Sequence, residues 1–235
     1  MNPAEIYLGH SQPCDYLPGE TAQMVFLPPD TPLSMSQYSV LVAKGFRRSG
    51  QLVYRPHCPD CRACIPVRIP TARFLPTRSQ RRCWHRNQDL TVIAREAEFR
   101  REHYELYLRY LKARHADGSM VDSTPEDYMN FLTCPWCDTL FYEFRWQDRL
   151  LAVAVVDLLD DALSAVYTFF DPDEARRGLG TYAILWEIAA AERMELKWLY
   201  LGYWIARCGK MAYKNKFQPL EYFHDNRWQT CAASQ

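Results

Sequence analysis

The stretch DPDEARRGLG, residues 171–180, decides the fold through the elements that lie on either side of it. Before it come the valine-rich run 150–156 and the β-branched and aromatic run 164–170, and the two aspartates between these runs indicate a hairpin turn. After it, residues 181–196 have the pattern of a mostly buried helix and residues 197–203 that of another strand. The sequence therefore predicts a β-hairpin, a glycine-containing loop, a helix and a strand.

The two glycines of this loop, Gly178 and Gly180, indicate a backbone that approaches a ligand closely. Free N–H groups at the start of a helix favour a phosphate or an oxyanion, and Arg176 and Arg177 strengthen the positive field. Acyl-CoA N-acyltransferases place pyrophosphate on such a loop with the pattern Gln/Arg-x-x-Gly-x-Gly/Ala. Ala175 stands in the first position here, so a glycine turn before a core helix is the competing interpretation.

The rest of the chain predicts short helices and strands without an internal repeat. Helices are expected at 34–44, 77–89, 98–113 and 126–132, and strands at 21–27, 46–56, 65–69, 90–94 and 139–146. The class is therefore α+β, a mixed sheet flanked by helices with a cysteine-containing N-terminal region. A change in charge near residue 95 predicts two regions, 1–95 and 96–235.

Net charge is zero, but the charges are strongly segregated along the chain. Residues 44–86 carry eleven Lys and Arg, ten of them arginine, against the single acid Asp60, whereas residues 87–235 carry 17 basic and 23 acidic groups. Arginine suits bidentate contacts with phosphate and carboxylate. This density indicates RNA, an acidic substrate, or both, although some arginines are expected to pair with the acidic remainder.

Composition excludes several classes of protein. With 48% hydrophobic and 24% charged residues, the chain is typical of a globular protein. Asp157 interrupts the longest apolar run, so no membrane span is predicted. The beginning of the sequence lacks the pattern of a secretion signal, and nine cysteines are then expected to be reduced thiols in a cytoplasmic protein.

Three cysteines in the segment HCPDCRAC, residues 57–64, have a spacing that suits metal ligands. Cys58, Cys61 and Cys64 lie between two predicted strands, and Cys14 is a candidate fourth ligand of zinc or an iron–sulfur cluster. The alternative is that these thiols pack as small apolar side chains. We expect no required cofactor, with zinc or a cluster as the rival expectation.

Two basic segments are candidates for binding. In the predicted helix 77–89 the basic residues recur at spacings of three and four and share one face; they are Arg78, Arg81, Arg82, His85 and Arg86. Near the C-terminus, Lys210 and Lys214 are four apart and enclose Tyr213, so that an aromatic ring and two cations can meet a nucleotide. An ordinary solvated helix surface is the alternative for both segments.

Taken together, three stretches resemble the aminoacyl-tRNA–protein transferases, and among these the bacterial aspartate/glutamate leucyltransferases. They are residues 45–64, from GFRRSG to the cysteines; FLPTRSQRR, residues 74–82; and LSAVYTFFDP, residues 163–172, with YLGYWI at 200–205 and KMAYK at 210–214. The resemblance implies transfer of leucine from leucyl-tRNA to proteins with N-terminal Asp or Glu, which marks them for N-degron degradation. It implies no DNA and no membrane partner.

The resemblance also implies an N-acyltransferase-like (GNAT-like) fold whose acyl donor is an aminoacyl-tRNA, which agrees with Ala175 in the CoA-pattern position. Eukaryotic relatives bind an iron–sulfur cluster through four cysteines, two of them in an N-terminal Cys-x-x-Cys. Leu17 stands here where the second of these cysteines is expected after Cys14, so the sequence departs from that pattern.

Roles for individual residues follow as expectations. The candidates that orient the aminoacyl group or relay a proton are Tyr167, Tyr203 and Lys210. Those for the aminoacyl-tRNA are Arg176, Arg177, Gly178, Gly180, Lys210, Tyr213 and Lys214. Those for the acidic acceptor are Arg47, Arg48, Arg78, Arg81 and Arg82. Rival functions are arginyl transfer to the same acceptors, CoA-dependent N-acetylation, and a non-catalytic RNA-binding module that contains a metal.

Overall fold

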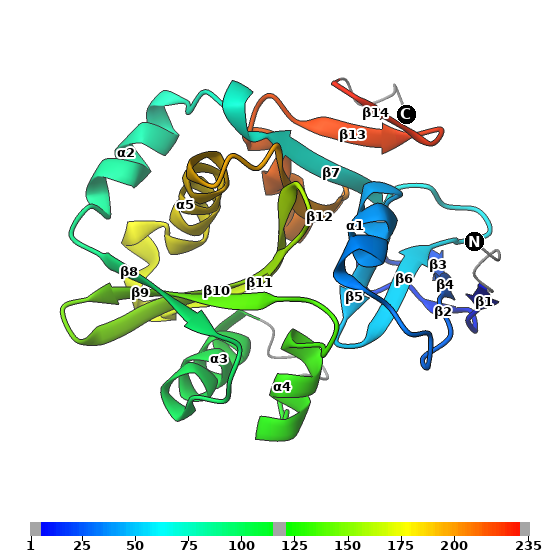
Figure 1. The fold of residues 1–235 in the computed structure, drawn as a ribbon, viewed down its shortest axis with the longest axis horizontal. Helices are drawn as coiled ribbons and strands as arrows, with labels where there is room; N and C mark the ends of the chain where they lie inside the picture. Colours follow the sequence, from blue (N-terminus) through cyan, green and yellow to red (C-terminus); the bar gives the residue numbers. More distant parts are fainter. Residues whose placement is uncertain (1–5, 115–120, 231–235) are drawn as a thin grey trace.

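The computed structural model describes residues 6–114 and 121–230, and its largest element is an eight-stranded sheet with the order β14-β13-β7-β12-β11-β10-β9-β8 (Figure 1). All neighbouring strands are antiparallel except β11 and β12, so the sheet is mixed. The strands are β14 (Arg227–Gln229), β13 (Glu221–His224), β7 (Ile65–Pro70), β12 (Trp198–Trp204), β11 (Ala162–Phe170), β10 (Arg149–Leu158), β9 (Thr139–Trp146) and β8 (Thr91–Glu96).

The parallel pair β11 and β12 separates soon after it begins. Three positions pair, from Ala162 opposite Trp198 to Ser164 opposite Tyr200, and the described part of the chain holds no further pair between these strands. Each strand also has an irregularity beyond that point. Val166 is an extra residue of β11 against β10. In β12, two residues, one of them Gly202, lie opposite a single residue of β7. The sheet therefore opens between β11 and β12.

Helices cover both faces of this sheet (Figure 1). On one face lies α5 (Leu179–Arg193), against which α2 (Arg78–Arg86) packs; on the other lie α3 (Arg101–Arg114) and α4 (Pro125–Leu132). Alternate residues of β10 enter the two resulting cores: Ala154 packs in the core of α5, and Val153 and Val155 in the core of α3 and α4. Burial on both faces explains why the β10 sequence is a continuous apolar run.

A smaller sheet with the order β1-β4-β6-β5 is built from the N-terminal part of the chain. Its strands are β1 (Tyr7–Leu8), β4 (Met24–Phe26), β6 (Leu52–Pro56) and β5 (Arg47–Ser49), and a separate two-stranded pair comprises β2 (Gln12–Pro13) and β3 (Thr21–Ala22). The helix α1 (Met35–Ala43) begins at a capping box in which Ser34 and Gln37 each bond the other's backbone N–H.

The predicted division into residues 1–95 and 96–235 follows a change in charge, and both regions contribute strands to the large sheet. The strand β7 precedes residue 95 and β8 spans it, and β7 lies between β12 and β13 inside the large sheet while β8 forms its edge. The region 1–95 therefore supplies strands to the same sheet as the region 96–235. Within the described residues, no helix is both long and apolar enough to cross a membrane.

A buried ion pair fastens the small sheet to the large one. Arg48 of β5 donates from Nε and Nη2 to both carboxylate oxygens of Asp157 on β10, at 2.7 and 2.6 Å, and its side chain is 1% exposed. Nη2 also donates to the carbonyl of Leu132, at the end of α4. The same carboxylate accepts from Thr139 and from Tyr38 of α1. One carboxylate therefore connects α1, β5, β9 and β10.

We expect Arg48→Met to destabilise the protein by about 3–5 kcal/mol, because it leaves the Asp157 carboxylate buried without a cation. Equilibrium urea unfolding at pH 7 measures the change. The double variant Arg48→Met/Asp157→Leu removes both charges and is expected to recover most of the loss. A single variant as stable as the parent protein would show that this pair does not hold the two sheets together.

Candidate functional site

Two buried cations lie on either side of Gly202, where β12 separates from β11. Gly202 has a φ of +74°, a conformation that favours glycine. A Cβ atom built on it would lie 3.7 Å from Nζ of Lys214 and 3.8 Å from Nε of Arg47. Arg47 belongs to β5 of the small sheet, and Lys214 to the short 3₁₀ helix η3 (Tyr213–Lys216). The tertiary structure thus brings together two cations that lie far apart in the sequence.

Neutral groups surround the guanidinium of Arg47, which is 6% exposed. Its Nη1 donates to the carbonyls of Phe46 at 2.7 Å and Val42 at 3.4 Å, and Nη2 lies 3.5 Å from the carbonyl of Gly202. Its central carbon lies 5.3 Å from the ring centre of Tyr200. Nε is buried and has no hydrogen-bond partner in the described part of the chain. Arg47 therefore keeps a donor unused.

The ammonium group of Lys214 is also buried among neutral groups. Nζ donates to the carbonyl of Tyr203 at 2.6 Å and lies 3.5 Å from Sδ of Met211. Burial, and to a lesser extent the charge of Arg47, lower the pKa of Lys214 to about 7. Among the described residues no carboxylate forms an ion pair with either cation. The arrangement is therefore suited to an anion.

The side chain of Lys214, which the sequence suggested as a contact of the tRNA end, is buried. The spacing of Lys210 and Lys214 implied one continuous helix, but the helix α6 (Gly209–Ala212) ends before Lys214, and η3 continues with 3₁₀ geometry. Residues four apart no longer share a face across that change. Lys210 and Tyr213 stay exposed, as expected for residues that meet a large ligand.

Tyr203 has a structural role that the sequence did not indicate. Its hydroxyl donates to the carbonyl of Gly45 at 2.9 Å and is buried between β12 and the small sheet. Burial raises the pKa of Tyr203 well above its ordinary value. The hydroxyl is thus already bonded to Gly45, and the expectation that Tyr203 handles a proton does not fit this placement.

Tyr167 lies on β11 among aromatic rings from the helices that cover it. Its ring centre lies 5.4 Å from that of Phe131 and 6.1 Å from that of Tyr107. Burial raises the pKa of Tyr167 well above its usual range, and the hydroxyls of Tyr110, Tyr107 and Tyr16 add to this effect. The hydroxyl is therefore neutral at pH 7 and can donate a hydrogen bond, but it is not a base. Tyr16 was not singled out from the sequence.

The cysteines expected to bind a metal gather around Cys64. Burial, and to a lesser extent the neighbouring thiols of Cys58, Cys14, Cys61 and Cys208, raise the pKa of the Cys64 thiol to about 12. Cys208, which no spacing rule indicated, belongs to the same cluster and packs with Leu17 and Ile205. Within the described ranges, no three side chains are placed as ligands of one ion. A zinc or iron–sulfur site therefore stays a prediction and enters no step below.

Basic side chains on the exposed face of α2 lie beside the glycine loop. Arg78, Arg81 and Arg82 are exposed, while Gln80 and Cys83 are buried on the opposite face. Asn87, just after α2, donates to the carbonyl of Arg177 at 2.9 Å, and Arg86 donates to the carbonyl of Arg176. The exposed guanidinium of Arg176 and the arginines of α2 thus lie on neighbouring elements.

The α2 arginines and Arg47 do not form one site, contrary to the expectation that both read the acceptor. Figure 1 shows α2 at the opposite side of the molecule from β5. Arg48 is also unavailable to an acceptor, because it is buried against Asp157. Arg177 is bound to the chain itself: it donates to both oxygens of Asp89, at 2.9 Å each. Only Arg47 of the expected acceptor group lies buried next to the strand opening.

The glycine loop is a rigid part of the fold. Its residues 172–177 form the 3₁₀ helix η2 (Pro172–Arg177), followed by Gly178 with a φ of +67°. A Cβ on Gly180 would lie 3.1 Å from the ring of Phe170, so this glycine permits close packing of α5 against β11. Buried Asp171 anchors the start of the loop by accepting from Arg149 at 2.6 Å and Arg109 at 3.2 Å.

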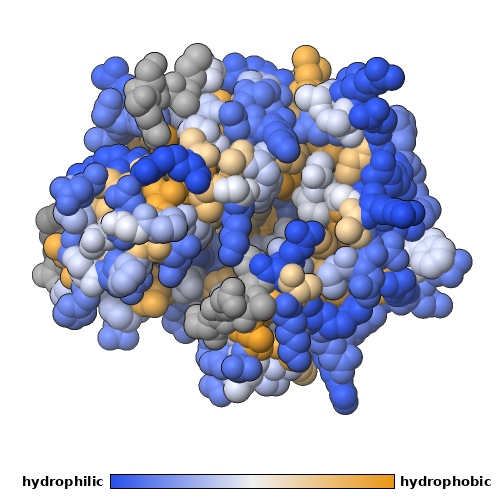
Figure 2. Space-filling view, turned by 180° about the vertical axis from the view of Figure 1, so that it is seen from behind, coloured by the Kyte–Doolittle hydropathy of each residue, from blue (hydrophilic) through white to orange (hydrophobic). Residues whose placement is uncertain are grey.

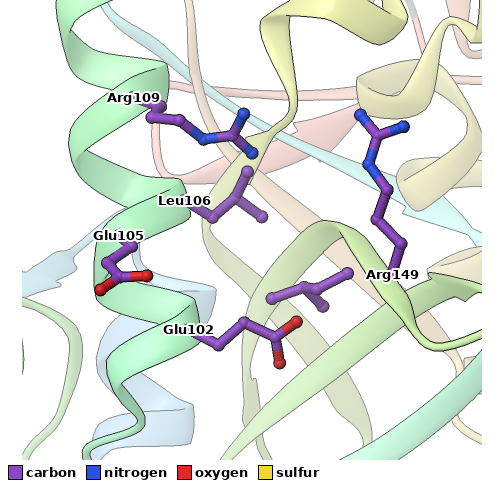
Figure 3. Close-up of a pocket in the computed structure, with 6 residues that line it drawn as sticks. Glu102, Glu105, Leu106, Arg109 and Arg149 are labelled. Carbon is purple, nitrogen blue, oxygen red and sulfur yellow. The ribbon is translucent and has the colours of Figure 1, made fainter.

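A pocket of about 220 Å³ lies between α3 and the start of β10 (Figure 3). Figure 3 shows Arg109 and Arg149 at one end of it and Glu102 and Glu105 at the other. All four charged side chains already have partners in the chain: the arginines pair with Asp171, Glu102 pairs with Arg145, and Glu105 pairs with Arg101. The pocket therefore lacks the unpaired charges that distinguish the surroundings of Gly202.

The molecular surface is hollowed near the middle of its rear face. Figure 2 shows hydrophobic side chains in the depth of this hollow and hydrophilic ones around its rim. A concave surface with an apolar floor and a polar rim is the usual form of a ligand site. The hollow and the buried cations are two distinct features, and each is typical of a ligand-binding protein.

Comparison with known proteins places the chain in one family. The family model described as "Arginine-tRNA-protein transferase, C terminus" matches residues 102–224, and that described as "Arginine-tRNA-protein transferase, N terminus" matches residues 12–82. The chain is 54% identical to an aspartate/glutamate leucyltransferase of Nitrosococcus oceani over 95% of its own length and 94% of the relative's. It is 50% identical to one of Pseudomonas putida, over 96% of each.

A solved structure titled "The structure of L-PGS from Bacillus licheniformis" is similar with a TM-score of 0.48 and 11% identity. The match covers 61% of this chain and 47% of that one. The family assignment therefore depends on the sequence comparisons and not on this likeness.

The lowered pKa of Lys214 predicts how stability changes with pH. Between pH 7 and the ordinary lysine pKa of 10.5, the unfolded chain holds a proton that folded Lys214 has lost, so rising pH favours folding. We expect the free energy of unfolding of the parent to rise relative to that of Lys214→Met across this range, by up to about 1.4 kcal/mol per pH unit. Urea unfolding at several pH values measures the difference.

The matched control is Lys216→Met, which removes an exposed lysine from the same 3₁₀ helix. It is expected to keep the pH dependence of the parent protein. Parallel curves for Lys214→Met and the parent would contradict a lowered Lys214 pKa.

Proposed function

The chain belongs to the arginine-tRNA–protein transferase family, and on this premise we propose that it transfers leucine from leucyl-tRNA to the N-terminal Asp or Glu of acceptor proteins. The observation that carries the proposal is the identity of 50–54% to aspartate/glutamate leucyltransferases over nearly the whole of both chains. Acceptors that gain an N-terminal leucine are thereby marked for N-degron degradation.

The proposed fold is that of an N-acyltransferase, with the acyl ester entering where β11 and β12 separate. The parallel strands β11 and β12 separate after three paired positions, and the glycine loop and α5 connect them in the chain. This arrangement supports the assignment. Opening of the sheet leaves backbone groups of both strands without strand partners, and these can receive an extended substrate. Gly180 permits close packing of α5 against Phe170 of β11, and a Cβ on Gly178 would contact Cys83 of α2.

The reaction is aminolysis of an ester. The acceptor's α-amine attacks the leucyl carbonyl, the new C–N bond forms, the bond to the ribose oxygen breaks, and the proton lost by nitrogen is taken up by that oxygen. An α-amine has an ordinary pKa of about 7.7–8.0, so a fraction is already uncharged at pH 7. Positioning alone can lower such a barrier by roughly 7–11 kcal/mol. Binding geometry is therefore the main contribution of the protein.

Two side chains near the opening, Cys64 and Tyr167, suit a direct transfer in which the enzyme forms no covalent bond to the leucyl group. The raised pKa of Cys64 keeps its thiol protonated and poorly nucleophilic. The neutral hydroxyl of Tyr167 is suited to donate a hydrogen bond to an oxygen of the ester, which orients the leucyl group. Tyr167 is accordingly proposed as a substrate-orienting donor.

The tRNA end is proposed to bind the exposed basic surface formed by α2, Arg176, Lys210 and Tyr213. These side chains are exposed, and hydrogen bonds tie α2 to its surroundings at both ends: Gln80 donates to the carbonyl of Lys216, and Arg86 to that of Arg176. Exposed arginines attract phosphates from a distance, and salt weakens this attraction. The α2 arginines are therefore reassigned from the acceptor to the tRNA.

The proposed function is tested by mixing purified protein with radiolabelled leucyl-tRNA and peptides that begin with Asp, Glu, Arg or Ala. We expect label to enter the Asp and Glu peptides only. Arginyl-tRNA and acetyl-CoA are parallel donors in the same assay. Transfer from arginyl-tRNA alone would replace leucine as the donor, transfer from acetyl-CoA alone would favour the acetyltransferase alternative, and transfer from none of them would overturn the proposal.

Removal of charge from α2 is expected to weaken leucyl-tRNA binding. In Arg78→Gln/Arg82→Gln we predict a KM for leucyl-tRNA that rises roughly tenfold, with a salt dependence shallower by about two phosphate contacts. The KM for the acceptor peptide should not change. The matched control Lys197→Gln/Arg227→Gln removes two exposed charges outside α2. A larger effect on the peptide KM than on the tRNA KM would return these arginines to the acceptor.

A further inference from the structure

The surroundings of Gly202 form an anion site, and we propose that it holds the side-chain carboxylate of the acceptor's N-terminal Asp or Glu between Arg47 and Lys214. The identity of the acceptor rests on the proposed function, whereas the anion site itself rests on the geometry of these three residues.

The first observation is that the guanidinium of Arg47 and the amine of Lys214, which is about half protonated at pH 7, are both buried without a counter-ion. The side chains of Arg47 and Lys214 bond to backbone carbonyls and a thioether, which are neutral groups. Burying charge is costly unless an opposite charge accompanies it. Repulsion between the two cations adds to that cost, as the effect of Arg47 on Lys214 indicates. An anion that enters the site removes both penalties.

The second observation is an unused donor. Nε of Arg47 is buried and without a partner in the described part of the chain, although an N–H group in that state costs about 1–3 kcal/mol. On the other side of Gly202, Lys214 uses one strong bond, to the carbonyl of Tyr203, and one weak contact with a sulfur atom. Each cation therefore has at least one N–H available to an incoming oxygen.

The third observation is the space that glycine leaves. An atom at the missing Cβ position of Gly202 would lie 3.7 Å from one cationic nitrogen and 3.8 Å from the other, which is ordinary contact distance. The proposed carboxylate would approach from this side, with one oxygen toward each nitrogen. The carbonyls of Gly202 and Tyr203 lie nearby and oppose a second negative charge. These features favour a carboxylate, a planar monoanion, over a phosphate group.

The location selects the acceptor as the source of the carboxylate. Gly202 lies in the part of β12 that no longer pairs with β11, so the site adjoins the opening proposed for the leucyl ester. In Asp and Glu only one or two methylene groups separate the carboxylate from the α-carbon. A carboxylate held at Arg47 and Lys214 therefore keeps the α-amine within a few bonds of the opening. Asn and Gln lack the charge, and would leave both cations unpaired.

The test compares Lys214→Met with its matched control Lys216→Met, and circular dichroism and thermal unfolding verify that both variants fold. Calorimetry measures the dissociation constants of peptides that begin with Asp or Asn and are otherwise identical. For Lys214→Met we expect the Asp peptide to bind about 10- to 100-fold more weakly, as for loss of one charged hydrogen bond. Binding of the Asn peptide, and both constants for Lys216→Met, should not change.

Kinetics with leucyl-tRNA provide the second measurement. The Lys214→Met variant should lose kcat/KM for Asp and Glu peptides while its KM for leucyl-tRNA stays that of the parent. If Lys214→Met does not fold, Arg47→Lys serves in its place, because it keeps a cation but removes the Nε donor, and the same loss for the Asp peptide is expected.

Two results would overturn the inference. One is an equal loss of binding for Asp and Asn peptides, which would make Lys214 a structural residue. The other is a raised KM for leucyl-tRNA with unchanged peptide binding, which would assign the site to a tRNA phosphate. Failure of the proposed function is a separate outcome, since it appears as absence of leucyl transfer by the parent protein, while calorimetry still tests the anion site.

Discussion

The buried ion pair of Arg48 and Asp157 is the constraint on which the remaining arrangement depends. It joins the small N-terminal sheet to the centre of the large one, and its carboxylate also bonds Thr139 and Tyr38. Neighbouring residues of a strand point to opposite faces. Because Arg48 is held against β10, Arg47 is directed to the other side, where it meets Gly202 of β12. A structural contact thus fixes the position of the cation that faces the strand opening.

The protein separates its cations into two physically different groups. The arginines of α2 are exposed, so salt screens their charges, and they can attract a polyanion from a distance without strong selectivity. Arg47 and Lys214 are buried, so water and salt screen their charges only weakly and the interaction with a bound anion is strong. An exposed group of cations suits the attraction of a large nucleic acid. A buried group suits discrimination between a carboxylate and an amide. Under the proposed function, these two groups of cations recognise the two substrates separately.

Most elements of the fold were predictable from local pattern, while the site was predictable only in part. The helix α1 and its Ser34 cap, α2 with its exposed basic face, and the order from β10 to β12 agree with the expected ranges. The expectations for Arg48, Arg177, Tyr203 and Lys214 differed from what the structure shows. Arg48, Arg177 and Tyr203 each bond a group distant in the sequence, which no local pattern contains, and Lys214 is buried by the packing of η3. Cys208 and Tyr16 escaped notice for the same reason.

Sequence alone determined the elements, the segregation of charge and the family resemblance, because these depend on residue type, spacing and neighbours along the chain. Only the tertiary structure decided which arginines are free. The change of α6 into η3 buried Lys214, and the separation of β11 from β12 placed it beside Arg47, which lies 167 positions earlier in the sequence. Burial and the absence of a counter-charge are properties of a packed environment. A cation becomes a specific anion site only when the fold removes water and every other partner from it.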